Sequence, residues 1–141
     1  AHDCVLGDKV IMSNAAQLAG HVEVGYRSII SGMAKIVQFV KIGDHSFIGA
    51  DAKIVKDVPT YSLVGAKEPV KFDGVNKVGL SRRGFDSDTV KEIERFYRLV
   101  LQSGYNTSEG LKKYKDEHPS IIKEIQTAID FIENSEKGIY R

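Results

Sequence analysis

Bulky apolar residues recur at every sixth position through the first part of the chain. The nine positions are Leu6, Met12, Leu18, Val24, Ile30, Ile36, Ile42, Ile48 and Ile54. A period of six fits neither an α-helix nor an alternating strand. It is typical of a parallel β-helix, in which each hexad supplies one flat face and one corner. The pattern therefore predicts a left-handed parallel β-helix of three 18-residue coils over residues 1–59, with these side chains in a narrow core.

Small residues accompany the apolar ones and indicate where the coils turn. Gly7, Gly25 and Gly43 follow apolar positions and are separated by three hexads each, so they form one column on the coils. We expect this corner to need a backbone angle that glycine adopts easily. The repeat ends at Pro59, which has no N–H to give to a strand ladder.

The second half of the chain has a different pattern. Residues 60–84 are rich in glycine and basic residues, which predicts an irregular connection with short strands. Residues 85–141 predict an α-helical C-terminal domain, whose first helix begins with Asp86 or Ser87 as N-cap and stops at Gly104. A second helix is expected over Ser108–Glu117. A third is expected to start at Pro119 and to bury Ile122, Ile125, Ile129 and Ile132.

Composition excludes several classes of protein. The 141 residues are 42% hydrophobic and 28% charged, with a net charge of +1, which excludes a disordered chain and argues against bulk nucleic-acid binding. No apolar run reaches the roughly 20 residues of a membrane span. The one cysteine, Cys4, excludes a disulfide framework and a multi-thiolate metal site, and suits a reducing compartment such as the cytoplasm. The chain starts Ala1-His2-Asp3 without an initiator Met, so we expect a fragment.

The predicted three-hexad coil converts linear positions into columns. One column holds His2, Gly20 and Gln38, and the adjacent column on the same face holds Asp3, His21 and Phe39. An imidazole is suited to proton abstraction near neutral pH, and a carboxylate can orient it. The exposed Gly20 N–H could hold a developing oxyanion. The arrangement predicts acyl transfer to a hydroxyl or an amine.

Other residues give weaker indications. His45 lies on a different face and His118 precedes a proline, so we interpret His45 as solvated or structural and His118 as a loop residue. No metal site is expected, because two neighbouring histidines are one ligand short of a catalytic zinc site, although a subunit interface could supply a third.

A further column suggests a groove. Asn14, Gly32 and Ala50 are small or polar and stack on a neighbouring face, where they could admit an acyl tail or pack against another subunit. The adjacent guanidinium groups of Arg82 and Arg83 suit phosphate or carboxylate recognition, or form a solvated basic turn.

Several motifs together resemble the UDP-N-acetylglucosamine 3-O-acyltransferases, which catalyse the first step of lipid A biosynthesis. The matching segments are Ala1-His2-Asp3-Cys4, Leu18-Ala19-Gly20-His21-Val22, Gly32-Met33, Gln38-Phe39, Asp57-Val58-Pro59, Gly74-Val75-Asn76, Gly79-Leu80, Arg82-Arg83-Gly84-Phe85 and Lys137-Gly138-Ile139-Tyr140-Arg141. Members of that family are about twice as long, so the chain resembles their C-terminal half. Val37 stands where the relatives carry a histidine, so substrate or acyl specificity is expected to differ.

The resemblance implies roles for individual residues. His2 would be the general base for the sugar 3-hydroxyl, His21 would bind the nucleotide sugar or the acyl group, and the Gly20 N–H would polarise the thioester carbonyl. Asn76, Arg82 and Arg83 would contact the nucleotide or the phosphopantetheine of the donor, and Gly32 and Ala50 would line the acyl groove.

The resemblance also implies partners. The acceptor would be UDP-N-acetylglucosamine, and the donor a (3R)-hydroxyacyl thioester on acyl carrier protein, with no other cofactor. The assembly would be a homotrimer with active sites between subunits. Five lysines are candidates for docking the acidic carrier, or form a solvated face: Lys35, Lys53, Lys67, Lys71 and Lys77.

Three alternatives stay open from the sequence. The first is the N-acyltransferase of the same pathway, whose acceptor is an amine on an already acylated sugar. The second is a non-catalytic trimeric scaffold, and the third is a hexapeptide-repeat metalloenzyme. The acyl chain length and the choice between a 3-hydroxyl and a 3-amino acceptor are also open.

Overall fold

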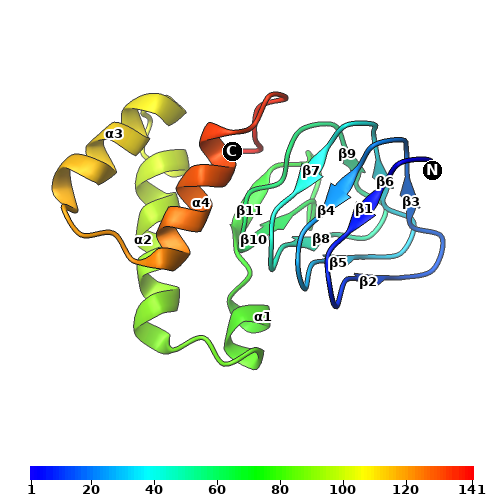
Figure 1. Ribbon diagram of the computed structural model, residues 1–141, viewed down its shortest axis with the longest axis horizontal. Helices are drawn as coiled ribbons and strands as arrows, with labels where there is room; N and C mark the ends of the chain where they lie inside the picture. The colour runs from blue at the N-terminus through cyan, green and yellow to red at the C-terminus, as the bar shows by residue number, and fades with distance from the viewer.

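The computed structural model describes all residues, 1–141, and begins with a three-coil parallel β-solenoid. Nine two-residue strands follow one another at the predicted spacing of six (Figure 1): β1 Val5–Leu6, β2 Ile11–Met12, β3 Gln17–Leu18, β4 Glu23–Val24, β5 Ile29–Ile30, β6 Lys35–Ile36, β7 Lys41–Ile42, β8 Phe47–Ile48 and β9 Lys53–Ile54. The predicted parallel β-solenoid of three coils is confirmed.

Each strand pairs in parallel with the strand three hexads further along the chain. Leu6 is opposite Val24, and Val24 is opposite Ile42. The strands form three sheets, of which two hold the orders β1-β4-β7 and β3-β6-β9. The third, β2-β5-β8, is extended by β10 (Ser62–Val64) and by β11 (Phe72–Val75), which is antiparallel to β10. The columns inferred from the sequence are therefore columns of the structure.

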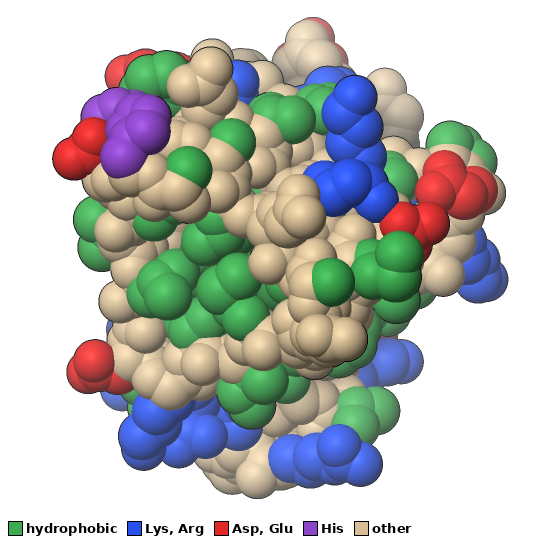
Figure 2. All heavy atoms as spheres, turned by 90° about the vertical axis from the view of Figure 1, so that its right-hand side faces the viewer, with side chains coloured by type: hydrophobic (Ala, Val, Ile, Leu, Met, Phe, Trp, Pro, Cys, Tyr) green, Lys and Arg blue, Asp and Glu red, His purple; other side chains and the backbone are tan.

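The core of the solenoid contains two inward-facing residues per hexad. Val24, Ile30 and Ile36 are buried, as the apolar period predicts, and so are the smaller residues four places after an apolar position, such as Val22 and Ala34. Leu6 of the first coil is 50% exposed. Figure 2 looks onto this end of the solenoid and shows apolar side chains in its middle.

Three columns of two-residue corners join the sheets. The histidine corner comprises residues 2–3, 20–21 and 38–39, the aromatic corner residues 8–9, 26–27 and 44–45, and the groove corner residues 14–15, 32–33 and 50–51. The second residue of every corner has a positive φ, for example 59° at Asp3 and 58° at His21. The residues expected on flat faces thus lie where the chain turns.

The glycine column does not have the role that the sequence suggested. Gly7, Gly25 and Gly43 do not adopt positive φ. They are instead required by close approach to the next coil, because a Cβ on Gly43 would lie 2.5 Å from the Thr60 nitrogen and one on Gly7 2.8 Å from the Tyr26 nitrogen. The expectation of an unusual backbone angle there was wrong.

The connection at residues 60–84 contains the expected short strands β10 and β11, and also a helix that the sequence did not predict. This helix, α1 (Lys77–Arg82), is capped by Asn76, whose side chain accepts a hydrogen bond from the Gly79 N–H. The Asn76 amide donates to the His45 carbonyl at 3.0 Å. Asn76 therefore ties α1 to the last coil.

Three longer helices follow, at the end of the solenoid opposite the chain's N-terminus (Figure 1). They are α2 (Ser87–Gln102), α3 (Thr107–Glu117) and α4 (Lys123–Glu133). Asp86 caps α2 through a bond from the Thr89 N–H, as predicted. The predicted start of the last helix was wrong, because α4 begins at Lys123 rather than at Pro119. Ile122, which was expected to be buried, is the N-cap of α4 and is exposed.

Buried polar contacts fix the helices and the tail against the solenoid. The Tyr97 hydroxyl of α2 donates to the Thr60 carbonyl at 2.7 Å, and full burial raises the pKa of Tyr97. The buried Asp57 carboxylate accepts from the Lys41 N–H at 2.8 Å and from the Ser135 hydroxyl at 2.6 Å. No helix of the chain has the length and apolarity needed to cross a bilayer.

Candidate active site

The histidine corner brings two imidazoles and a carboxylate together. The His2 Nδ1 and the Asp3 Oδ2 are 2.9 Å apart, and the His21 Nε2 lies 3.7 Å from the same carboxylate oxygen. The two imidazole rings meet edge to face with centroids 5.1 Å apart. In Figure 2 the histidine side chains gather at one edge of the end face, beside an acidic group. The predicted juxtaposition of His2, Asp3 and His21 is confirmed.

The coil register fixes this geometry. The His21 N–H donates to the His2 carbonyl at 3.0 Å, and the Phe39 N–H donates to the Gly20 carbonyl at 3.1 Å. Phe39 also stacks on the His21 ring with centroids 4.8 Å apart and planes 6° from parallel. The sequence placed Phe39 beside His21 without predicting that it orients the ring.

Gly20 lies directly beneath the His2 imidazole. A Cβ at Gly20 would meet the His2 Cε1 at 2.7 Å and the Nε2 at 2.9 Å. Gly20 is consequently buried, not exposed as expected from the sequence. Its N–H makes no hydrogen bond within the chain. His2 Nδ1 faces Asp3, and of the two ring nitrogens Nε2 is the nearer to where a Cβ of Gly20 would lie.

Gln38 occupies the next coil of the same corner and lines a hollow along the β3-β6-β9 sheet. The hollow has a volume of about 450 Å³ and is bordered by Leu18, Lys35, Val37 and Lys53 among others. Asn14, Gly32 and Ala50 stack at the groove corner, where the Gly32 carbonyl accepts from the Asp51 N–H. None of the five principal hollows of the structure is lined by any of these three residues.

The remaining predicted binding residues lie elsewhere in the chain. Asn76 and Arg82 line a separate hollow of about 390 Å³ with apolar residues of the extended sheet, including Ile29, Phe47 and Leu63. This hollow contains no residue of the histidine corner. Within one chain, therefore, the structure does not bring Asn76 and Arg82 to His2.

Arg83 does not line this hollow and instead contacts the aromatic corner. Its Nη1 lies 3.3 Å from the His45 Nδ1. The His45 ring is also packed among Tyr26, Tyr61 and Phe85. Burial lowers the pKa of His45, and the nearby Arg83 charge lowers it further. His45 is thus structural, one of the two interpretations made from the sequence. Its contact with Arg83 joins segments far apart in the sequence, which no local pattern could reveal.

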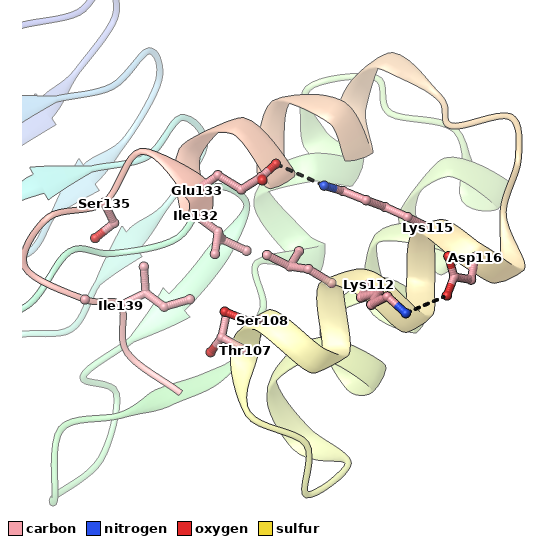
Figure 3. Close-up of a pocket in the computed structure, with 11 residues that line it drawn as sticks. Thr107, Ser108, Lys112, Lys115, Asp116, Ile132, Glu133, Ser135 and Ile139 are labelled. Atoms are coloured by element: carbon pink, nitrogen blue, oxygen red, sulfur yellow. Dashed lines mark hydrogen bonds and ion pairs between the residues drawn. The ribbon is translucent and has the colours of Figure 1, made fainter.

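A larger hollow lies outside all these sites (Figure 3). It has a volume of about 560 Å³ and lies between α3, α4 and the C-terminal tail. Its charged groups neutralise one another: Lys115 pairs with Glu133 at 3.2 Å, and Lys112 with Asp116 at 3.8 Å. It contains no histidine or cysteine. The chemistry-bearing cluster of this chain is the histidine corner.

Comparison with known proteins identifies the family. A family model described as "Udp N-acetylglucosamine O-acyltransferase; Domain 2" matches residues 57–140, more than half of the chain. The chain belongs to the Udp N-acetylglucosamine O-acyltransferase family. This confirms the resemblance to that family, and the matched residues include the Arg82-Arg83-Gly84-Phe85 motif.

Relatives and solved structures of similar name match the whole chain. The acyl-[acyl-carrier-protein]–UDP-N-acetylglucosamine O-acyltransferase of Thermodesulfovibrio yellowstonii is 47% identical over 141 residues, which are 100% of this chain and 54% of the relative. The enzyme of the same name from Thiobacillus denitrificans is 36% identical, and the match again covers 100% of this chain and 54% of the relative.

Two crystal structures of UDP-N-acetylglucosamine O-acyltransferase family members have the same fold. The UDP-N-acetylglucosamine acyltransferase of Bacteroides fragilis 9343 has a TM-score of 0.95 at 37% identity, covering 100% of this chain and 55% of that one. The enzyme of Moraxella catarrhalis RH4 has a TM-score of 0.88 at 40% identity, covering 100% and 54%. The chain spans about half the length of these relatives, and the coverage does not confirm the expectation that it is their C-terminal half.

Proposed function

We propose that the protein transfers a (3R)-hydroxyacyl chain from acyl carrier protein to the 3-hydroxyl of UDP-N-acetylglucosamine, the first step of lipid A biosynthesis. The relatives that match the whole chain are named for acyl transfer from acyl carrier protein to UDP-N-acetylglucosamine. The observation that carries the proposal for this chain is that the His2 imidazole contacts the Asp3 carboxylate through Nδ1 and covers the side-chain-free position of Gly20.

The contact with Asp3 prepares His2 to act as a base. When His2 Nδ1–H donates to the Asp3 carboxylate, the proton of the neutral imidazole is on Nδ1 and the lone pair is on Nε2. Nε2 takes the proton of the sugar hydroxyl while the hydroxyl oxygen attacks the thioester carbonyl. The tetrahedral intermediate then expels the phosphopantetheine thiolate, which receives that proton from the imidazolium. The products are the ester and the free thiol.

Gly20 supplies the second part of the reaction. Its N–H is free of internal hydrogen bonds, and its Cα faces the His2 ring without a side chain between them. In this proposal it donates to the oxyanion of the tetrahedral intermediate, a type of contact that contributes about 3 kcal/mol in other enzymes. His21 and Gln38, on successive coils of the same corner, bind the acceptor or the acyl group.

The remaining assignments concern the substrates and the assembly. Asn76, Arg82 and Arg83 contact the nucleotide or the phosphopantetheine from a neighbouring subunit of a homotrimer, because within one chain Asn76 and Arg82 line a different hollow from the one beside Gln38. The acyl chain lies along the groove corner with Asn14, Gly32 and Ala50. The coils are left-handed, no cofactor beyond the thioester donor is needed, and the enzyme works in the cytoplasm.

The test is product analysis by mass spectrometry with the whole enzyme and a set of hydroxyacyl carrier donors. We expect acylation of UDP-N-acetylglucosamine and a loss of about 10²- to 10⁴-fold in rate for His2→Ala. His118→Ala, at the end of α3, is the matched histidine control and keeps the rate. An unchanged rate in His2→Ala would favour a non-catalytic scaffold, and acylation only of a sugar amine would favour the N-acyltransferase alternative.

A further inference from the structure

We infer that the histidine corner is also a binding site for an imidazole-seeking divalent ion such as Zn²⁺, and that the ion inhibits the enzyme. One nitrogen each of His2 and His21 and one carboxylate oxygen of Asp3 lie within 4.8 Å of one another. The two histidines alone are one ligand short of a zinc site, and Asp3 is the third donor in the same chain.

The two distances to the Asp3 carboxylate are close to those around a single small ion, and the two imidazole nitrogens lie within 4.8 Å of each other. Ligand atoms held about 2.1 Å from one zinc ion lie about 3.4 Å from each other. The Asp3 Oδ2 lies 2.9 Å from His2 Nδ1 and 3.7 Å from His21 Nε2. Shifts of a few tenths of an ångström, within the reach of side-chain rotation, bring these two contacts to the ideal spacing.

The donors are held in place before any ion arrives. One face of the His21 ring is stacked on Phe39, and the His21 backbone N–H donates to the His2 carbonyl. Gly20 carries no side chain that could separate the two rings. A site whose donors are already together loses little conformational entropy on binding, which favours affinity.

The donor set selects the kind of metal. Two imidazoles and one carboxylate suit Zn²⁺, Co²⁺, Ni²⁺ and Cu²⁺, whereas Mg²⁺ and Ca²⁺ prefer oxygen ligands. The side chains of His2, Asp3 and His21 are 70%, 64% and 43% exposed. The ion can therefore enter from solvent and keep water in its remaining position.

Inhibition follows from the tautomer of His2, and this step rests on the proposed function. A metal bound to Nδ1 displaces the proton that Nδ1 shares with Asp3, so the proton of the neutral ring must be on Nε2. Nε2 is then a donor and cannot accept the proton of the sugar hydroxyl. The metal thus occupies the orienting nitrogen and blocks the reacting one.

Metal binding is tested first, without any assay of activity. Co²⁺ is titrated into the tag-free chain with its terminal amine acetylated, and binding is followed by the visible absorption of the protein-bound ion. We expect one saturable site, and affinity about 100-fold weaker in His21→Ala and in Asp3→Asn, since even outer-shell changes cost about 10- to 100-fold. Imidazole ¹⁵N spectra with Zn²⁺ are expected to show His2 Nδ1 and His21 Nε2 as ligands.

Two controls separate this site from other metal-binding groups. His118→Ala removes a distant histidine and Cys4→Ser removes the only thiol of the chain, and both are expected to keep the affinity. Equal affinity in wild type and His21→Ala, or no saturable binding, overturns the site. Loss of the affinity in Cys4→Ser also overturns it.

Inhibition is tested separately on the whole enzyme. Zn²⁺ at saturating concentration is expected to abolish acyl transfer, and removal by a chelator is expected to restore it. Zn²⁺ binding that leaves the transfer rate unchanged overturns the inhibitory role and counts against His2 as the base. Failure of Co²⁺ to bind, with His2→Ala still inactive, overturns only the metal site.

Discussion

At the scale of the residue, the function of a side chain in this protein depends on which corner presents it. His2 and His45 occupy corner positions in the same repeat pattern, yet one is open to solvent beside a carboxylate and the other is packed among three aromatic rings. The difference comes from what covers each corner. α1 and the residues that follow it place Arg83 and Phe85 against His45, while the histidine corner is uncovered within the chain.

Burial of His45 predicts a specific pH dependence of stability. Its pKa in the folded protein is lowered from 6.5 by burial and by Arg83, so the unfolded chain binds more protons near that pH. The stability that the folded protein gains from a neutral His45 ring is fully present above about pH 6.5. It is lost as the pH falls through the lower pKa of His45 in the folded protein. We expect the free energy of unfolding to fall more between about pH 7.5 and pH 5 in wild type than in His45→Phe.

Urea denaturation at both pH values measures this difference. His118→Phe serves as the matched control. Because it leaves His45 in place, it is expected to retain the fall in the free energy of unfolding that His45 causes. The same pH dependence in His45→Phe and in wild type would contradict the assignment.

Gly20 provides a second prediction at this scale. Gly20→Ala places a methyl group 2.7 Å from the exposed His2 ring, which must then rotate away from both Asp3 and the proposed oxyanion donor. We expect kcat to fall by about 10²-fold in the whole enzyme, with a nearly unchanged free energy of unfolding. Asp8→Ala, at the first position of the aromatic corner in the first coil, is the control for a corner substitution. A wild-type kcat in Gly20→Ala would contradict the proposed geometry.

At the scale of the element, the last coil is joined to the C-terminal tail by one buried carboxylate. Asp57 bonds the Lys41 N–H and the Ser135 hydroxyl, and its backbone pairs with Gly138 and Tyr140. Asp57→Ala leaves both donors without a partner. We expect a loss of about 3 kcal/mol in the free energy of unfolding, measured by urea denaturation, and faster proteolysis of the tail.

The neighbouring change Ser135→Ala tests the same link from its other side. It removes one hydrogen bond and leaves the carboxylate bonded to the Lys41 N–H, so a smaller loss of about 1 kcal/mol is expected. Equal stability of Asp57→Ala and wild type would show that the tail does not depend on this carboxylate.

The elements also show which parts of the fold a sequence can specify. The strands β1 to β9 could be predicted directly from the period of six. Each strand pairs with the strand three hexads further along the chain, so the repeat itself determines the pairing. α1 was missed because it is short, includes Gly79, and depends on Asn76 contacts to a distant coil. The start of α4 was wrong because no side chain caps it, so no local signal marks its first residue.

The candidate site was predictable to the same extent and for the same reason. His2, Asp3, Gly20 and His21 meet because of the coil register, which the repeat reveals. The burial of Gly20 under His2 and the stacking of Phe39 depend on side-chain rotamers. The Arg83–His45 contact depends on how α1 docks. Neither rotamers nor docking leave a periodic trace in the sequence.

At the scale of the whole molecule, charge pairing changes which lysines suit an acidic carrier protein. Lys35 is paired with Asp51 at 2.6 Å and Lys77 with Glu94 at 3.5 Å. Lys53, Lys67 and Lys71 have no ion-pair partner in the structure, and Lys53 borders the hollow beside Gln38. The stripe that the sequence predicted from Lys35 and Lys53 is therefore partly neutralised.

The unpaired lysines predict the salt dependence of donor binding. We expect Lys53→Glu in the whole enzyme to raise the KM for the carrier-linked donor about tenfold at low salt, and rising salt to reduce the difference from wild type. Lys123→Glu, on α4, is the control and leaves this KM unchanged. A KM for the carrier-linked donor that does not respond to salt would contradict electrostatic docking.

The parallel register of the solenoid has a consequence for how the gene can change in length. Inserting or deleting the codons of three complete hexads adds or removes one whole coil and returns every later side chain to its own corner. An insertion one codon shorter or longer instead moves core residues into the turns. Viable length variants within the solenoid should therefore differ by whole coils. A coil inserted between His2 and Gly20 should abolish activity and keep the fold, because it moves the pair about 4.8 Å further apart.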